Sequence, residues 1–309
     1  MRILVIGAGV QGSVLAADLS ARGRDVTLLA GGSRGQQLMQ KGLTVDYRHS
    51  PVKRTFRIPV LLSLEPDDGY DCIITAVRFT QLQDLIGILN ANCSKNIILL
   101  GNDPLPDAFA AMLPKKSLLF AFCRTFGVCL PDRVRALDSR QITVGCLSAR
   151  KLTKADKVLI AGIFQGTGYK VVAEPNMGDF LLCRAACMSA VSMACCRSAG
   201  DMKKLKHDRV LPDRVIDAVI EAYRALEKTG HKILPETDGN YDSPSFRRTQ
   251  LRRLRQLCAA DPWRGCGSSY ASGAVEEQQA LIERVNMLLA ASGLPCPAWQ
   301  ELAQPAENT

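Results

Sequence analysis

Six residues near the N-terminus, Gly7-Ala8-Gly9-Val10-Gln11-Gly12, have the spacing G-x-G-x-x-G. In dinucleotide-binding proteins the first glycine permits a tight turn, the second lets the backbone approach a pyrophosphate, and the third lets a helix pack on the sheet. A helix that starts in this loop offers free N–H groups to phosphates. The six residues are therefore the predicted phosphate-binding loop. The alternative is a glycine-rich turn that binds nothing.

The type of cofactor depends on the segment Ala30-Gly31-Gly32-Ser33-Arg34. An NAD site usually has an acidic residue here that bonds the ribose 2′-hydroxyl. This chain has no acidic residue between Asp25 and Asp46. A carboxylate would repel a 2′-phosphate, whereas Ser33 and Arg34 could bind one, so we predict NADP(H). Alternatively, Arg34 lies on a solvated helix start.

The loop needs flanking elements to position it. Residues 2–6 form an apolar run that predicts a strand buried on both faces. Residues 13–22 predict a helix that ends at Gly23, and residues 25–30 predict a second apolar strand. Strand, loop, helix and strand within about thirty residues make up the dinucleotide-binding βαβ unit.

The next part of the chain continues the alternation of strands and helices. Alternating polar and apolar residues predict a hairpin from 43–47 and 55–60. Further strands are predicted at 72–77, 96–100, 118–123, 141–146 and 169–173, and helices at 36–40, 80–89 and 154–164. This order is typical of a parallel sheet covered by helices. We predict an α/β Rossmann doubly wound sheet domain.

The second half of the chain is helical in pattern. Pro175-Asn176 marks the predicted boundary, which gives an NADP-binding Rossmann domain at 1–174 and a helical substrate domain at 175–309. Helices are expected at 178–198, 212–228, 245–259 and 275–292. The predicted fold class is thus a Rossmann domain followed by an all-α C-terminal domain.

Composition narrows the class of protein. The chain has 309 residues, 47% of them hydrophobic and 22% charged, with a net charge of +9. No apolar run reaches the roughly eighteen residues that a membrane span needs, so we expect no membrane contact. The N-terminus lacks a signal-peptide cleavage pattern, and a cytoplasmic location is expected. The positive charge suits an anionic cofactor and an anionic substrate.

Cysteine and histidine spacing argues against a metal site. The chain has twelve cysteines, but no C-x-x-C occurs and the three histidines are scattered. We expect reduced thiols that act as small hydrophobic side chains, and no bound metal.

Arginines are concentrated between residues 247 and 255. Arg248, Arg252 and Arg255 fall on one face at helical spacing. A solvated helix face is the first interpretation, and an anion-attracting wall is the second. Nucleic acid binding is not expected, because no helix-turn-helix, zinc-finger or aromatic-stacking motif accompanies the charge.

The chain resembles the ketopantoate reductase family over essentially its whole length. The resemblance rests on the start M-R-I-L-V-I-G-A-G, on Ala76-Val77-Arg78 before a helix that contains Gln81, and on Asn102 after the next strand. The helical second half, and Glu277 upstream of residues 293–297, add to it. Members reduce a 2-oxo acid to a 2-hydroxy acid with NADPH, an early step towards pantothenate.

The resemblance implies a set of cofactor contacts. Arg34 is the nearest substitute for the family's arginine after the second strand, where this chain has glycines. Arg78 replaces a family lysine, and Asn102 precedes Asp103 instead of glycine. The residues expected to bind the cofactor are Gly7, Gly9, Val10, Gln11, Gly12, Ser33, Arg34, Val77, Arg78, Gln81 and Asn102.

The substrate helix differs from the family pattern. The family has a proton-donating lysine followed by two asparagines, each one helical turn further along. The best register places Arg184 at the lysine, Met188 at the first asparagine and Ser192 at the second. Arginine is effectively always charged, so Arg184 would be a poor general acid, although it could clamp a carboxylate. Arg184 could equally be an ordinary surface residue.

Two further substrate contacts are implied by the resemblance. Glu277 matches a carboxylate that bonds substrate hydroxyls, although acids are favoured in any first helical turn. Ser268 or Ser269 stands for the serine that binds the substrate carboxylate. The expected catalytic residues are Arg184, Asn102 and Glu277, and the expected substrate contacts are Ser192, Ser268 and Ser269.

The sequence thus predicts an NADPH-dependent 2-oxo acid reductase of the ketopantoate reductase type, which could be a homodimer. Two alternatives stay open. One is an NADP(H)-binding protein of the same fold with impaired catalysis. The other is a dehydrogenase with a different small carbonyl substrate.

Overall fold

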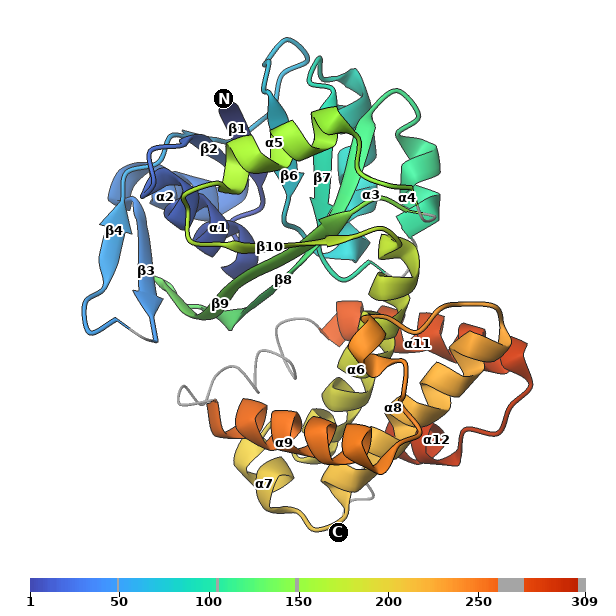
Figure 1. The fold of residues 1–309 in the computed structure, drawn as a ribbon. Coiled ribbons are helices and arrows are strands. Elements are labelled where there is room, and N and C mark those ends of the chain that lie inside the picture. Colours follow the sequence, from blue (N-terminus) through green and yellow to red (C-terminus); the bar gives the residue numbers. More distant parts are fainter. Residues whose placement is uncertain (49, 104–105, 148–149, 261–274, 305–309) are drawn as a thin grey trace. The chain divides into compact units, whose positions relative to one another are not determined.

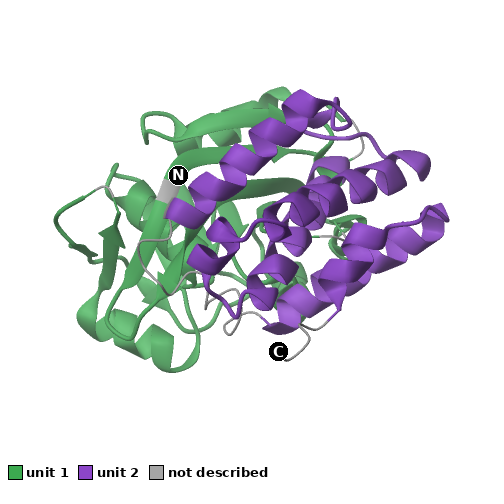
Figure 2. Ribbon diagram, turned by 90° about the horizontal axis from the view of Figure 1, so that it is seen from below, with its two compact units in different colours: residues 1–178 green, residues 179–309 purple. Residues whose placement is uncertain are grey.

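A computed structural model describes residues 1–48, 50–103, 106–147, 150–260 and 275–304 (Figure 1). The chain divides into two compact units, Met1–Gly178 and Asp179–Thr309 (Figure 2). The first contains the sheet and the second is helical, so the predicted fold class is confirmed.

Six strands of the first unit are parallel neighbours. In the order in which they lie in the sheet they are β5 (Val60–Leu61), β2 (Asp25–Leu29), β1 (Arg2–Ile6), β6 (Cys72–Thr75), β7 (Asn96–Leu100) and β8 (Ser117–Cys129). Numbered by sequence, these six run 3-2-1-4-5-6, the strand order of dinucleotide-binding sheets. The order reverses between β1 and β6. That reversal places a ligand-binding crevice at the carboxyl ends of these two strands.

The rest of the sheet contains both parallel and antiparallel pairs, which corrects the expectation of a purely parallel sheet. β9 (Val134–Gly145) is antiparallel to β8, and it runs parallel to β3 (Leu43–Tyr47) and β10 (Lys170–Glu174). The expected hairpin is confirmed, since β3 pairs antiparallel with β4 (Arg54–Phe56). Val60, however, leaves that hairpin and pairs with β2 instead.

β8 and β9 are longer than their apolar cores predict. Local pattern gave only 118–123 and 141–146, because the intervening residues are mixed in polarity. The pairing of the two strands shifts in register between Cys123 and Thr125, and the backbones continue to pair after that shift. The pair therefore continues to Cys129 and Val134 as a long hairpin.

Helix α1 (Val10–Ser20) is buried along most of its length. Asp18 near its end is 5% exposed and accepts hydrogen bonds from the hydroxyls of Tyr47 at 2.7 Å and Tyr169 at 3.1 Å. These bonds tie α1 to β3 and to the segment before β10. The phosphate-loop helix is thus fixed from residues far along the chain.

The other helices of the first unit are α2 (Gly32–Lys41), α3 (Phe79–Ala91), α4 (Pro106–Met112) and α5 (Lys154–Phe164). Helix α5 was predicted to the residue. Its cap explains why, since the Thr153 side chain accepts a hydrogen bond from the Asp156 backbone N–H at 3.1 Å. Helix α4 was not predicted, and it spans only 7 residues.

The helices of the second unit are α6 (Met177–Arg197), α7 (Met202–His207), α8 (Leu211–Lys228), α9 (Pro244–Ala260), α11 (Val275–Ser292) and α12 (Pro297–Ala303). Helix α6 begins two residues before the division between the units. The core of this unit is built on α8. Glu221 of α8 caps α12 by accepting from the backbone N–H groups of Ala298 at 3.1 Å and Trp299 at 2.9 Å. The Trp299 ring is 2% exposed.

By length and composition α6 could cross a membrane, which corrects the expectation that no such run exists. Its 21 residues include a window with a mean hydropathy of 1.4. Of that window, 61% is buried inside the protein. Burial of this extent is typical of the core helix of a globular unit.

Candidate functional site

The loops that follow β1 and β6 touch at the carboxyl edge of the sheet. A Cβ on Gly7 would lie 2.5 Å from the Ala76 carbonyl oxygen and 3.0 Å from a Val77 methyl group, and the φ of Gly7 is +109°. The Gly7 N–H also donates to the Leu29 carbonyl at 3.0 Å, at the end of β2. Only glycine fits this turn, which lies at the point where the strand order reverses.

The other two glycines of the loop differ in what they permit. A Cβ on Gly12 would lie 2.0 Å from the Gly7 carbonyl oxygen, so glycine is needed there for the close packing of α1. For Gly9, no described atom lies within 4 Å of such a Cβ. Packing therefore does not require glycine at position 9. The open space beside Gly9 is what a pyrophosphate would need.

Helices α1, α2 and α3 follow β1, β2 and β6 and so begin at this same edge. Their N-caps are Gly9, Gly31 and Arg78, and none of the three helices has an acidic residue in its first turn. The free N–H groups and positive dipole ends are therefore not offset by carboxylates. The edge favours an anionic ligand.

Arg34 lies in the first turn of α2 beside Ser33, whose side chain is exposed. Its Nη1 donates to the Gln37 Oε1 at 3.0 Å. Its Nε and Nη2 are buried and have no hydrogen-bond partner among the described residues. Buried donors without acceptors each cost about 1–3 kcal/mol. Two of the three guanidinium nitrogens are thus left without an acceptor, which a phosphate could supply.

The remaining predicted cofactor residues lie on the loops after β6 and β7. A Cβ on Gly101 would lie 3.7 Å from the Val77 carbonyl oxygen, so the two loops are neighbours. Asn102 has a buried Oδ1 with no partner in the described parts of the chain. Gln81 instead caps its own helix, because its Oε1 accepts from the Arg78 backbone N–H at 3.3 Å.

Sequence reasoning missed three residues of this edge. Gly35 lets α2 pack on the end of β2, since a Cβ there would lie 1.9 Å from the Ala30 carbonyl oxygen. Gln37 contacts Arg34 one turn earlier, a spacing that could have indicated it. Cys129, at the end of β8, had no sequence signal. Loss of solvation raises the pKa of its thiol, while the guanidiniums of Arg34 and Arg78 act in the opposite direction.

In the second unit, α6 carries the three residues of the predicted substrate register. Arg184 Nη2 lies 3.8 Å from the Met188 Sδ, so these two side chains meet along one face. Ser192 is 3% exposed, and its hydroxyl is buried without a partner among the described residues. Glu277 is half-buried in the first turn of α11. Ser268 and Ser269 lie outside the described residues.

A series of linked, buried polar side chains that the sequence did not indicate begins on α6, between Arg184 and Met188. The Cys187 thiol is 3.0 Å from the Tyr223 hydroxyl, which donates to Asp238 at 3.2 Å. Burial raises the pKa of Cys187 and that of Tyr223. Both groups therefore stay protonated at neutral pH. They connect α6, α8 and the segment that precedes α9.

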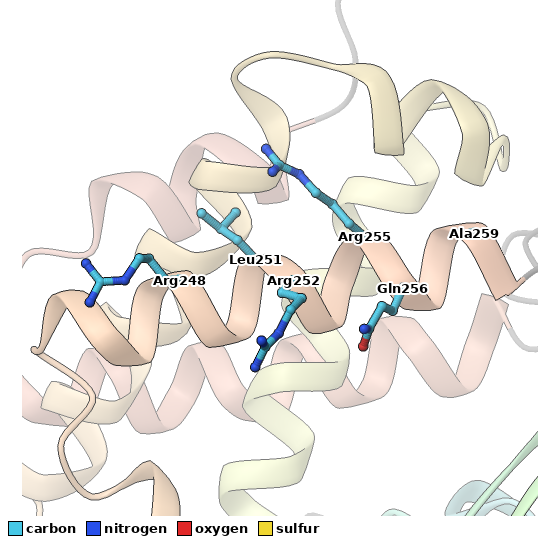
Figure 3. A pocket seen from close by; sticks show the side chains of 6 residues that line it. All are labelled: Arg248, Leu251, Arg252, Arg255, Gln256 and Ala259. Carbon is cyan, nitrogen blue, oxygen red and sulfur yellow. The ribbon is translucent and has the colours of Figure 1, made fainter.

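The arginine face of α9 does not form a converging site. A shallow pocket is lined by residues of this helix alone, namely Arg248, Leu251, Arg252, Arg255, Gln256 and Ala259. Figure 3 shows that the three guanidiniums point in different directions. A bound anion needs donors aimed at one place. The arrangement favours the interpretation of a solvated helix face.

Residues 3–149 match the family model described as Ketopantoate reductase PanE/ApbA. These residues therefore belong to the ketopantoate reductase family. The resemblance seen in the sequence is confirmed, and the family indicates an oxidoreductase of the ketopantoate reductase type. No curated protein matches the sequence.

Solved ketopantoate reductases share the fold of the whole chain. A 2-dehydropantoate 2-reductase from Geobacter metallireducens GS-15 is 16% identical, with a TM-score of 0.79 over 99% of both chains. A dimeric ketopantoate reductase from Staphylococcus aureus is 14% identical, with a TM-score of 0.68 over 98% of this chain and 96% of the other.

A third solved structure with this fold is a dehydrogenase that is not named as a ketopantoate reductase. D-mandelate dehydrogenase, in a ternary complex with NADH and anilino(oxo)acetate, is 17% identical, with a TM-score of 0.75 over 98% of this chain and 96% of the other. At these identities the likeness concerns the fold alone. Whether the substrate and the nucleotide are also alike depends on the residues of this chain.

Proposed function

We propose that this chain is an NADPH-dependent reductase of a 2-oxo acid. The observation that carries the proposal is the carboxyl edge of the sheet, where three helices begin without an acidic residue in the first turn and one of them carries Arg34 with two buried nitrogens that lack acceptors among the described residues. A dinucleotide with a 2′-phosphate supplies the anionic groups that such an edge favours. Family membership supplies the reaction type.

The residues of this edge fit the cofactor. The space beside Gly9 and the start of α1 would hold the pyrophosphate, while Ser33 and Arg34 would hold the 2′-phosphate. Arg78 and Val77 lie on the neighbouring loop, and Arg78 adds positive charge near the phosphates or the ribose. When bound, NADPH supplies the hydride.

The substrate class follows from charge and register. In the proposed site Arg184 binds the carboxylate of a 2-oxo acid or polarises its carbonyl, because guanidinium matches carboxylate geometry. Within the same unit, Glu277 would bond the substrate hydroxyls, and Ser192 would add a hydroxyl. Arg184 does not deliver the proton, since guanidinium keeps its charge in proteins, so the oxygen that becomes the hydroxyl would take its proton from water.

One observation favours a second candidate, an NADP(H)-binding protein of the same fold with little catalysis. Met188 packs against Arg184 where the family has an amide, and the Ser192 hydroxyl is buried. A third candidate is a dehydrogenase with another small carbonyl substrate. The acid anilino(oxo)acetate bound by D-mandelate dehydrogenase is a carbonyl compound of this kind. NADPH oxidation by the purified protein against a panel of 2-oxo acids separates the three.

Assembly and compartment are also proposals. We propose a homodimer, by analogy with the dimeric reductase from Staphylococcus aureus. A reducing compartment such as the cytoplasm suits the chain, because the cysteines in its described parts are free thiols.

NADPH is expected to bind at least about tenfold more tightly than NADH, a difference of roughly 1.4 kcal/mol. Arg34→Ala should remove most of this difference, because it weakens the binding of NADPH and not that of NADH, which has no 2′-phosphate. Isothermal titration calorimetry with both nucleotides measures it. Arg22→Ala, at an exposed turn position two residues after the end of α1, serves as the control. Equal affinities of the wild-type protein for the two nucleotides would contradict the assignment of a 2′-phosphate site.

A further inference from the structure

The tip of the β8–β9 hairpin, Cys129–Val134, lies against the start of α2. The tip is closed by a hydrogen bond from the Leu130 N–H to the Arg133 carbonyl at 2.8 Å. Its Pro131 carbonyl accepts a hydrogen bond from the Gln37 Nε2. A segment far along the chain therefore contacts the helix that begins after β2.

Gln37 uses both ends of its amide in this contact. Its Oε1 accepts from the Arg34 Nη1 at 3.0 Å while its Nε2 donates to Pro131. Arg34 and Gln37 are three residues apart in α2, so they share a helix face. The amide cannot be reversed, because its NH₂ group would then face a guanidinium that has only donors. Gln37 is thus fixed as a bridge between the hairpin tip and Arg34.

The bridge occupies only one of the three guanidinium nitrogens. Nε and Nη2 of Arg34 are buried and lack acceptors within the described residues. At the start of the same helix, a Cβ on Gly31 or Gly32 would have no described atom within 4 Å, so space lies open there. A phosphate in that space would accept from donors that otherwise stay unsatisfied.

We propose that Gln37 is a positioning residue for cofactor specificity. It holds the Arg34 guanidinium through Nη1, with the Pro131 carbonyl as anchor, and so presents Nε and Nη2 to the ribose 2′-phosphate of NADP(H). The hairpin tip thereby contributes to nucleotide preference without touching the nucleotide. This inference rests on the proposed NADP(H) function and extends it to residues outside the sequence motifs.

The test compares Gln37→Leu, which removes both amide contacts at similar size, with the wild-type protein. Dissociation constants for NADPH and NADH are measured by calorimetry, and those for adenosine 2′,5′-bisphosphate and adenosine 5′-phosphate isolate the 2′-phosphate. We expect Gln37→Leu to raise the dissociation constants for NADPH and for the bisphosphate about tenfold. NADH and adenosine 5′-phosphate should bind as before, a split that general loosening of the fold would not produce.

Two further variants complete the experiment. Gln37→Met also removes both amide contacts at similar size and adds no charge, so it should lose the preference for NADPH in the same way. It serves in place of Gln37→Leu if that variant does not fold. Gln36→Leu makes the same change at an exposed neighbouring position and should bind like the wild-type protein.

The outcomes separate this inference from the proposed function. If the wild-type protein prefers NADPH and the folded Gln37 variants keep the full preference, the inference is wrong and the proposed cofactor stands. If the wild-type protein does not distinguish NADPH from NADH, the proposed function fails and this inference fails with it.

Discussion

Replacing Gly9 with Val is expected to abolish NADPH binding while the fold remains intact. No described atom lies within 4 Å of a Cβ at this position, and the residue has a φ of −71° that valine tolerates. The side chain would fill the space that the pyrophosphate needs. Valine is also a poorer helix N-cap, at a cost of about 1 kcal/mol. Calorimetric titration and circular dichroism measure binding and fold separately.

Gly12 gives the matched control. A Cβ there would meet the Gly7 carbonyl oxygen at 2.0 Å, so Gly12→Val should disturb the packing of α1 and lower the melting temperature. The two substitutions are the same change within one loop, and they should differ in which property is lost. Unchanged NADPH affinity in Gly9→Val would show that the phosphate loop is misassigned.

The wild-type protein is expected to turn over ketopantoate slowly or not at all, although it binds NADPH. Arg184 cannot give up a proton at neutral pH, and Met188 and Ser192 cannot replace two amide contacts to the substrate. The triple substitution Arg184→Lys, Met188→Asn and Ser192→Asn should raise ketopantoate reduction. General acid catalysis contributes about 10²–10⁴-fold, so a restored proton donor would be plain in steady-state kcat/KM values.

A second triple variant isolates the proton donor. It combines Arg184→Gln with the same two asparagine substitutions, so it restores the amides without a titratable group. Activity in the lysine triple that is absent from the glutamine triple would assign the gain to proton transfer. Rapid wild-type turnover that is unaffected by Arg184→Ala would instead place the active site on other residues.

Fold and site residues have diverged to different extents. The Geobacter reductase is only 16% identical yet shares the fold over 99% of both chains. Many different apolar side chains can fill a core of given volume, so a fold tolerates such change. A proton donor depends on a particular chemical group. For this reason we base the substrate proposal on Arg184, Met188 and Ser192 instead of on the fold.

The sequence by itself determined the elements whose signals are local. Helix α5 was predicted at residues 154–164 because its cap, Thr153 with Asp156, lies within one turn of its start. The βαβ unit and the missing acid after β2 were also readable, since each lies within a short stretch of sequence. The same holds for α11, which was predicted at its observed bounds, 275–292.

Only the tertiary structure decided how these elements combine. The strand order, the antiparallel β9 and the full length of β8 depend on backbone pairing between distant residues. The spacing of Gly7, Gly9 and Gly12 predicted a separate role for each, but only the structure shows which atoms a side chain at each position would meet. The Gln37 contact with Pro131 joins residues 94 positions apart. Such contacts have no local pattern, because they form only when the sheet has brought its strands together.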